Sequence, residues 1–317
     1  MKMKGKFQLM KRVCLVLSLG VILASCKKDI DQVSEPELVA KDYHQTAVTQ
    51  FVTSGDIKYA YRVLGDQEGT PLLMISALGG SMDDWDPAVT NGIAQKNKVI
   101  IFDIQGVGAT NGKTPDNIAD MAKSAVSFIK ALGVGKVNLM GFSMGSFVSQ
   151  QIALTEPALV NKIILTGTGP KGSQGLSNLP NLLAAAAGLS PEESFLKFGF
   201  TSSAASQAAG KQSWARVQKR ILNRDIPLSQ EGSLAELTAV LGWAQPYPNA
   251  LAELKRITQP VLIVQGENDL PVPVINAINM SQSFPDAKLI IYPDSGHSAF
   301  TQNYEQFVPA ANAFLEK

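Results

Sequence analysis

Short apolar runs alternate with amphipathic stretches along most of the chain. Two runs, at 46–53 and 57–64, flank Ser54-Gly55-Asp56, and this combination predicts a β-hairpin. Further apolar runs bounded by turn residues are typical of buried strands, and they lie at 72–76, 98–103, 136–140, 161–166, 260–265 and 288–292. The pattern therefore predicts about eight strands.

Helical periodicity occupies most of the gaps between these runs. The clearest case extends from Thr114-Pro115, a capping hydroxyl followed by a proline in the first turn, to the helix-stopping Gly133. Helices are also predicted over 146–154, 274–284 and 301–316. Strands joined by helices imply a mostly parallel sheet flanked by helices on both faces, to which the hairpin adds an antiparallel edge.

The alternation lapses between residues 170 and 256. This stretch is rich in Ala, Ser and Leu and is broken by Gly and Pro, which predicts a series of short helices. It follows the sixth predicted strand, so we expect a helical cap over 170–256, inserted into a core formed by 46–169 and 257–317. Open α/β sheets bind ligands at the carboxyl ends of their strands, and we expect the cap to lie over that edge.

The first 25 residues have the parts of a bacterial export signal. A basic segment precedes an apolar run over 13–24, which is shorter than the roughly 20 residues of a membrane span. The run ends in Leu23-Ala24-Ser25-Cys26, which resembles the lipobox of bacterial lipoproteins. The resemblance implies cleavage before Cys26 and lipid attachment to it, and so a membrane anchor; an ordinary cleaved signal peptide is the alternative. Residues 26–45 read as a tether, and Lys27 favours the outer membrane of a bacterial cell envelope.

Composition narrows the possible chemistry. The five basic side chains of residues 1–25 are unmatched by acids, and removing them leaves 23 basic and 27 acidic side chains, a net charge of −4. A mildly acidic body lacks the basic surface that nucleic acids require. Both cysteines, Cys14 and Cys26, precede the globular part, and the chain has two histidines, His44 and His297. We therefore expect no disulfide and no metal centre in the globular part, and the serine-based chemistry described below requires no organic cofactor.

The strongest chemical motif is Gly141-Phe-Ser143-Met-Gly145, which follows an apolar strand and precedes a helix. This is the context of a nucleophile elbow, a sharp turn that exposes a serine hydroxyl. A serine nucleophile needs a base, and His297 is the candidate because His44 falls in the predicted tether. Asp269, in the loop after the strand at 260–265, is the candidate acid that orients the histidine; Glu267 in the same loop is its competitor.

With the order Ser143, Asp269, His297, residues 46–317 resemble the α/β-hydrolase superfamily. The segment from Asp103 to Gly108 is similar to the family's Asp-x-Arg-Gly-x-Gly turn, with Gln105 in place of the arginine. The segment 73–80, with Trp85 following, is similar to the family's oxyanion loop, although Ser76-Ala77 stands where His-Gly is usual. The resemblance implies an α/β-hydrolase fold and an oxyanion hole formed by the backbone amides of Leu78 and Met144.

These features together predict a serine hydrolase. The expected substrate is a small or medium, largely apolar carboxylic ester or lactone, cleaved through an acyl-enzyme intermediate in a pocket that Phe142 and Trp85 line. The same triad could instead cleave a carbon–carbon bond, a thioester or an amide, or form peracids as the cofactor-free haloperoxidases of the superfamily do. A protein of a different class, a catalytically silent, membrane-tethered binding protein, is the remaining alternative.

Overall fold

The computed structural model describes residues 41–316, and residues 41–317 make up one compact unit. The predicted signal peptide, the lipidation site Cys26 and most of the predicted tether lie outside the described residues. None of the helices formed by residues 41–316 combines the length and the apolar character needed to cross a membrane.

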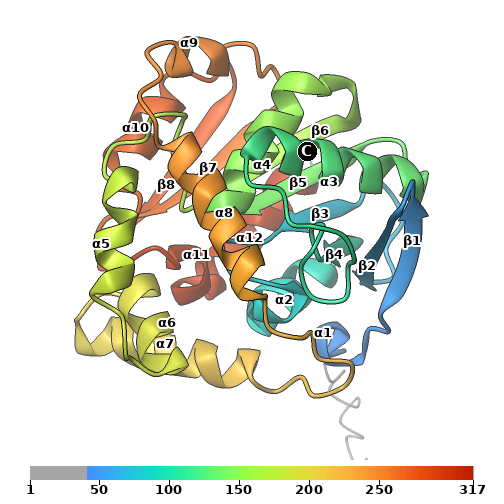
Figure 1. The fold of residues 1–317 in the computed structure, drawn as a ribbon, viewed down its shortest axis with the longest axis horizontal. Helices are drawn as coiled ribbons and strands as arrows, with labels where there is room; N and C mark the ends of the chain where they lie inside the picture. The colour runs from blue at the N-terminus through green and yellow to red at the C-terminus, as the bar shows by residue number, and fades with distance from the viewer. Residues whose placement is uncertain (1–40, 317) are drawn as a thin grey trace, which may run out of the picture. The chain divides into compact units, whose positions relative to one another are not determined.

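Residues 41–316 contain a sheet of eight strands in the order β1-β2-β4-β3-β5-β6-β7-β8 (Figure 1). The strands are β1 (Gln50–Ser54), β2 (Ile57–Leu64), β3 (Leu72–Ile75), β4 (Val99–Phe102), β5 (Val137–Phe142), β6 (Val160–Thr166), β7 (Val261–Gly266) and β8 (Ala287–Tyr292). β1 pairs antiparallel with β2, β2 pairs antiparallel with β4, and all other pairs are parallel. The predicted α/β-hydrolase sheet, with a hairpin at one edge, is confirmed.

The strand sequences explain which strands lie inside. Every residue of β3, β4 and β7 is buried, and these strands are almost wholly aliphatic because helices cover both of their faces. Successive side chains point to opposite faces. In β3, Leu73 and Ile75 accordingly join one hydrophobic cluster while Leu72 and Met74 join the other.

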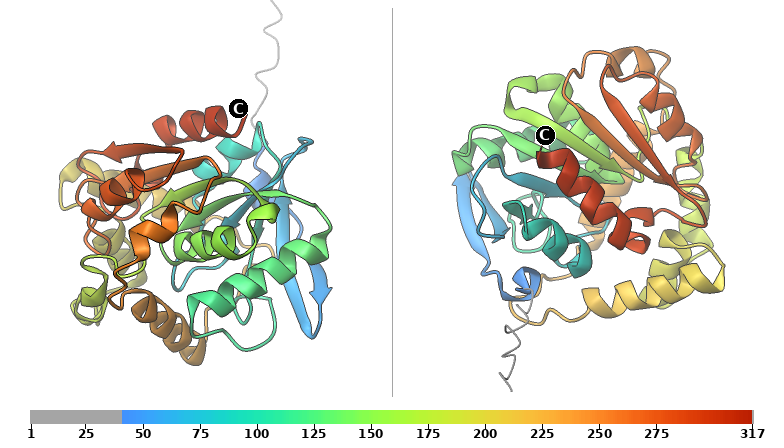
Figure 2. Two further views of the ribbon diagram at one scale, coloured as in Figure 1. Left: turned by 90° about the horizontal axis from the view of Figure 1, so that it is seen from above. Right: turned by 180° about the vertical axis from the view of Figure 1, so that it is seen from behind.

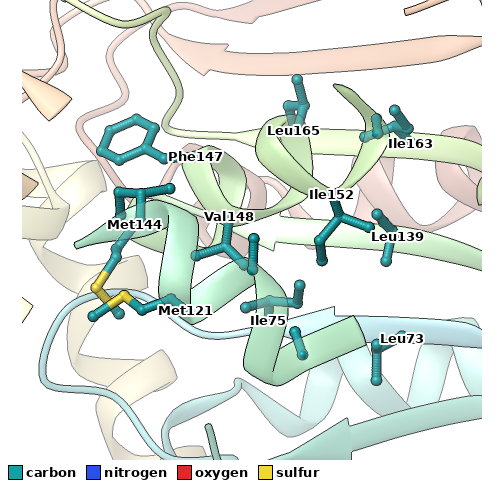
Figure 3. Packing of buried hydrophobic residues seen from close by; sticks show 14 of the residues in the cluster. Leu73, Ile75, Met121, Leu139, Met144, Phe147, Val148, Ile152, Ile163 and Leu165 are labelled. Atoms are coloured by element: carbon teal, nitrogen blue, oxygen red, sulfur yellow. The ribbon is translucent and has the colours of Figure 1, made fainter. Parts of the chain in front are cut away.

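Helices cover both faces of the sheet, as predicted. On one face lie α3 (Ile118–Leu132), α4 (Met144–Thr155) and α10 (Ile275–Ser281); on the other lie α2 (Pro87–Ala94), α11 (Ala299–Gln302) and α12 (Tyr304–Glu316) (Figure 2). Figure 3 shows the core of the first face, where Met144, Val148 and Ile152 of α4 pack over the aliphatic side chains of β3, β5 and β6. This packing fixes α4, which begins directly after Ser143.

Two helix starts differ from the prediction. α3 begins at Ile118 rather than near Thr114, because the side chain of Asn117 accepts a hydrogen bond from the amide of Asp120 at 2.8 Å and caps the helix. The Thr114 hydroxyl instead donates to the carbonyl of Gly106. α2 was not predicted, although Asp86 caps it and Pro87 occupies its first turn. An aspartate followed by a proline is a local signal for the start of a helix.

The N-terminal boundary of the fold also differs from the prediction. Residues 43–46 form the short helix α1 (Tyr43–Thr46), and His44 on it is completely buried. Its Nδ1 atom lies 2.9 Å from the hydroxyl of Thr90, and burial lowers the pKa of His44 to about 4. The tether predicted over 26–45 therefore gives way to folded structure within its last residues.

The segment between β6 and β7, where the cap was predicted, is helical throughout its regular structure. It contains η3 (Leu176–Asn178), α5 (Leu179–Ala184), α6 (Pro191–Gly199), α7 (Ala204–Val217), α8 (Gln230–Trp243) and α9 (Ala250–Leu254). We call residues 170–256 the cap segment. It lies against the carboxyl ends of the strands, where α11 contacts α7 and α8 contacts the loop after β3.

Candidate active site

Ser143 stands at a sharp turn between β5 and α4. Its backbone has φ 52° and ψ −115°, a left-handed conformation that is rare for a residue with a side chain. The flanking glycines make the turn possible: a Cβ atom on Gly145 would overlap the carbonyl of Ile75, and one on Gly141 would overlap the carbonyl of Gly145. The predicted elbow geometry is therefore present, with the strain held by the packing of α4 on the sheet.

His297 and Asp269 come from the loops after β8 and β7 and meet at the same edge of the sheet. The Nδ1 atom of His297 lies 2.7 Å from Oδ2 of Asp269, and both side chains are buried. Asp269 also accepts hydrogen bonds from the amide of Val272 and from Nε2 of Gln265, each at 2.8 Å. Glu267, the competing acid, is exposed. The geometry thus pairs His297 with Asp269.

The imidazole ring of His297 fits into a space that other residues leave open. The ring centroid of Phe142 lies 5.1 Å from that of His297. Gly167, directly after β6, adopts φ +57°, and a Cβ atom there would lie 2.8 Å from Cε1 of His297 and 3.1 Å from the Phe142 ring. Any side chain at position 167 would displace the ring. The sequence analysis did not identify this residue.

The loop after β3 contains the predicted oxyanion donor Leu78. A turn closes where the Gly80 amide donates to the carbonyl of Ala77 at 3.0 Å, and the Ser76 hydroxyl donates to the carbonyl of Gly80 at 2.9 Å. Within residues 41–316, the amides of Leu78 and Met144 have no hydrogen-bond partner. For Met144 the reason is its place at the start of α4, where the first amides of a helix lack intrahelical acceptors.

Glu236 of α8 contacts the same loop and was not identified from the sequence. Its Oε2 accepts a hydrogen bond from the Gly79 amide at 2.6 Å, and its side chain is completely buried. The other carboxyl oxygen, Oε1, has no partner among the described residues. Burial raises the pKa of Glu236 to about 7, and the Gly79 hydrogen bond opposes that shift.

A cavity of about 430 Å³ joins these elements. Ser143, His297 and Leu78 lie in its wall, together with both predicted pocket residues, Phe142 and Trp85. The cap segment supplies about half of the remaining wall, and its large side chains there are apolar: Leu176, Leu179, Leu183, Phe195, Phe198 and Val240. The core side of the wall also contains the carboxyl-bearing residues Asp84 and Asp86. No hydrogen bond joins Ser143 to His297 within the described part of the chain; catalytic hydrogen bonds are often long before substrate binds. The side chain of Met144 lies in the hydrophobic core and is not part of the cavity wall.

The turn after β4 supports the loop that carries Trp85. Asp103 accepts hydrogen bonds from the amides of Met82, at 2.9 Å, and Ala109, at 3.2 Å. A Cβ atom on Gly108 would overlap the Asp103 carboxyl group, which explains the glycine. Gln105, in the position of the family's arginine, donates from Nε2 to the carbonyl of Lys113 at 2.8 Å.

Residues 70–304 match the family model of the alpha/beta hydrolase fold. The chain belongs to the α/β-hydrolase family. A solved structure of an alpha/beta hydrolase fold protein from Chitinophaga pinensis is 38% identical, with a TM-score of 0.84, and the match covers 86% of this chain and 99% of that one.

Two curated relatives are similar over most of their own length. A pimeloyl-[acyl-carrier protein] methyl ester esterase of Nitrosomonas europaea is 27% identical over 77% of this chain and 95% of its own. A poly(3-hydroxyalkanoate) depolymerase of Ectopseudomonas oleovorans is 26% identical over 78% of this chain and 85% of its own. The family and these relatives support a hydrolase activity for this α/β hydrolase.

The contact between Gly167 and His297 predicts the effect of a single methyl group. In Gly167→Ala the new Cβ pushes the imidazole out of line. For the ester hydrolysis proposed below, we expect the kcat for p-nitrophenyl acetate to fall about 100-fold, as displacements near 1 Å can cause. The matched control is Gly135→Ala, which carries a similar backbone strain at φ +73° with nothing within 4 Å. Equal kcat values for the two variants would show that position 167 does not set the histidine.

The raised pKa of Glu236 predicts a pH-dependent stability. Between pH 4.5 and 7 the folded protein keeps a proton that the unfolded chain releases, so the free energy of unfolding falls as pH rises through this range. Glu236→Gln removes this loss, and we expect the variant to gain about 2 kcal/mol relative to wild type between pH 5 and pH 8. Urea unfolding at both pH values measures the difference. Glu231→Gln, an exposed position on the same helix, should show no such gain.

Proposed function

We propose that this α/β hydrolase cleaves small or medium, largely apolar carboxylic esters or lactones through Ser143, His297 and Asp269. The observation that carries the proposal is the 2.7 Å contact between His297 and Asp269, in a cavity whose wall also contains Ser143 at a strained elbow. A nucleophile, a base and an acid that orients the base are the groups that acyl transfer requires.

In the first half of the reaction the Ser143 hydroxyl attacks the carbonyl carbon of the substrate, and Nε2 of His297 accepts its proton. Asp269 accepts a hydrogen bond from Nδ1–H of His297 and stabilises the imidazolium that forms. Because Asp269 also accepts two further hydrogen bonds, its carboxylate is fixed in orientation. The carbonyl oxygen becomes an oxyanion, for which the amides of Leu78 and Met144 are the proposed donors.

Collapse of this intermediate breaks the bond to the leaving alcohol, which takes the proton from His297, and leaves an acyl group on Ser143. In the second half, water attacks the acyl carbon and gives its proton to His297. The Ser143 oxygen then leaves and recovers that proton. The products are a carboxylic acid and an alcohol, or a hydroxy acid where the substrate is a lactone.

The cavity supports the choice of substrate. Its volume of about 430 Å³ lies in the lower part of the range of small-molecule sites, and most of the cap residues that line it are apolar. The names of the Nitrosomonas and Ectopseudomonas relatives describe proteins that act on esters and on a polyester. A small apolar acyl group bonded to oxygen is therefore the preferred substrate.

We further propose that the mature protein begins at Cys26 and is held by lipid at the outer membrane of a bacterial envelope. The basic segment, the apolar run and Leu23-Ala24-Ser25-Cys26 support this location. The mature chain would act on small esters at the membrane surface.

The nucleophile is tested with p-nitrophenyl esters of graded acyl length, using a chain that begins at Lys27. We expect turnover to be highest for short to medium acyl groups, and Ser143→Ala to lower kcat/KM by at least about 1,000-fold. Covalent labelling of wild type by a fluorophosphonate probe, absent from the variant, is the second measurement. Labelling without ester turnover would redirect the assignment to thioester, amide or carbon–carbon cleavage; neither labelling nor turnover would leave a binding protein.

The acid is tested by a matched pair of variants in one loop. In Asp269→Asn the side-chain amide can donate a hydrogen bond to Nδ1 of His297, where the carboxylate accepts one. This stabilises the tautomer with the proton on Nε2, which cannot accept the serine proton, so we expect kcat to fall by about 10³–10⁴-fold. Glu267→Gln changes an exposed carboxylate two residues away, and we expect kcat to remain within about twofold of wild type. A large loss in the Glu267 variant with little loss in the Asp269 variant would exchange the two roles.

A further inference from the structure

The loop between α7 and α8, residues 218–229, has an inverted polarity. Figure 1 shows this part of the chain passing beside α1. Arg220 is completely buried and the side chain of Asp225 is 3% exposed, whereas Ile221 is 88%, Leu222 55% and Ile226 71% exposed. Charged side chains thus point inward and large aliphatic side chains point into solvent.

A network of buried charges anchors this loop to the core and to α1. The Arg220 guanidinium donates hydrogen bonds to the carbonyls of His44, Gln45 and Ala47. Arg62 of β2 donates to the carbonyl of Asn223 at 2.8 Å, and the Asp225 amide donates to Asp83 at 2.6 Å. The backbone of the loop is therefore fixed, and the outward direction of its aliphatic side chains is a property of the fold.

This arrangement lowers the stability of the folded protein in water in two ways. Burying Arg220 and Asp225 removes them from solvent, and exposing three neighbouring aliphatic side chains forgoes their burial. We include Val48, 63% exposed, because it is the residue after Ala47, whose carbonyl accepts a hydrogen bond from Arg220. We call Val48, Ile221, Leu222 and Ile226 the aliphatic patch. A patch of this kind marks a surface that meets an apolar partner.

The charges around the patch indicate which partner. Within the loop, residues 218–229, the only acidic residue is Asp225, whose side chain is buried. The exposed charged residues of the loop are both basic, Lys219 and Arg224, and the exposed acid at the neighbouring α1 is its capping residue Asp42. A local excess of cations beside exposed aliphatic groups, on a chain whose part after residue 25 has a net charge of −4, is complementary to anionic lipid head groups over an acyl layer.

The position of the patch in the chain supports the same partner. Lys41 lies two residues before α1, which Arg220 holds, and only residues 27–40 separate it from Cys26. Fourteen residues extend at most about 50 Å, since each spans at most about 3.3–3.6 Å. A membrane that held Cys26 would therefore lie within reach of the patch.

We propose that the aliphatic patch, with Lys219 and Arg224, docks on the surface of an anionic lipid bilayer. Docking would fix the orientation of the hydrolase on its membrane, in addition to the tethering by Cys26. The proposal builds on the envelope location proposed above, but the contact itself needs no lipid on the protein.

The first experiment measures co-sedimentation of the unlipidated chain 27–317 with vesicles of phosphatidylcholine alone or mixed with phosphatidylglycerol. We expect binding to the anionic vesicles, and at least a tenfold weaker partition for the variant Ile221→Ser/Leu222→Ser/Ile226→Ser. The control variant Leu189→Ser/Leu234→Ser/Ile291→Ser removes exposed aliphatic groups elsewhere and should bind as wild type does. If wild type binds the anionic vesicles, equal partition of the patch and control variants would overturn the proposal.

A second experiment covers a contact too weak to hold the free chain. The chain 26–317 has Cys26 as its single cysteine, so it can be coupled there to maleimide lipid in the same vesicles. We expect slower amide hydrogen exchange over 218–229 on anionic vesicles than in solution. Unchanged exchange would overturn the proposal, and so would a concentration-dependent dimer in solution that the patch variant abolishes. Ester turnover measured without vesicles reports separately on the proposed function.

Discussion

The close approach between the first turn of α4 and the end of β3 is the constraint on which the site depends. Gly145 lies so near the carbonyl of Ile75 that no side chain fits between them. This contact forces the chain to turn sharply after β5, which leaves Ser143 in a left-handed conformation. It also brings the free amide of Met144 beside the loop that carries Leu78. One steric contact therefore positions the nucleophile and both proposed oxyanion donors, and the packing of α4 on the sheet stabilises it.

The cap segment contacts the loop of His297 and the loop after β3 through hydrogen bonds as well as apolar packing. On one side, Asp294, just before His297, accepts hydrogen bonds from the hydroxyls of Thr201 and Ser203, and the Ser298 amide donates to the carbonyl of Gly199. On the other side, Glu236 binds the loop after β3. The loop of the proposed base and the oxyanion loop are thus each held between core and cap. The cap segment therefore helps to position these two loops and also lines the cavity.

Local sequence signals were sufficient for most of the fold and for the centre of the site. Apolar runs marked the strands, Gly141-Phe-Ser143-Met-Gly145 marked the elbow, and scarcity singled out His297. The wrongly predicted start of α3 shows the limit of a capping rule. Thr114 is a residue type that often caps helices, but its hydroxyl donates to the carbonyl of Gly106, eight residues earlier. Glu236 and Arg220 had no local signal, because the backbone groups to which they are hydrogen-bonded lie more than 150 residues away in the chain.

The polar groups left without partners show what these long-range contacts do. Among the buried polar atoms that have no partner in the described residues, Oε1 of Glu236 and Oδ2 of Asp225 belong to cap residues that contact the core. Such groups cost stability, whereas an apolar junction of the same size would not. A shifted cap would keep that cost and would also lose the hydrogen bonds to Gly79, Asp83 and α1, so the polar junction favours one docked arrangement over its neighbours. A cavity of defined shape around Ser143 requires a cap fixed in one position. The buried charges hold the cap there, and their burial lowers the free energy of unfolding.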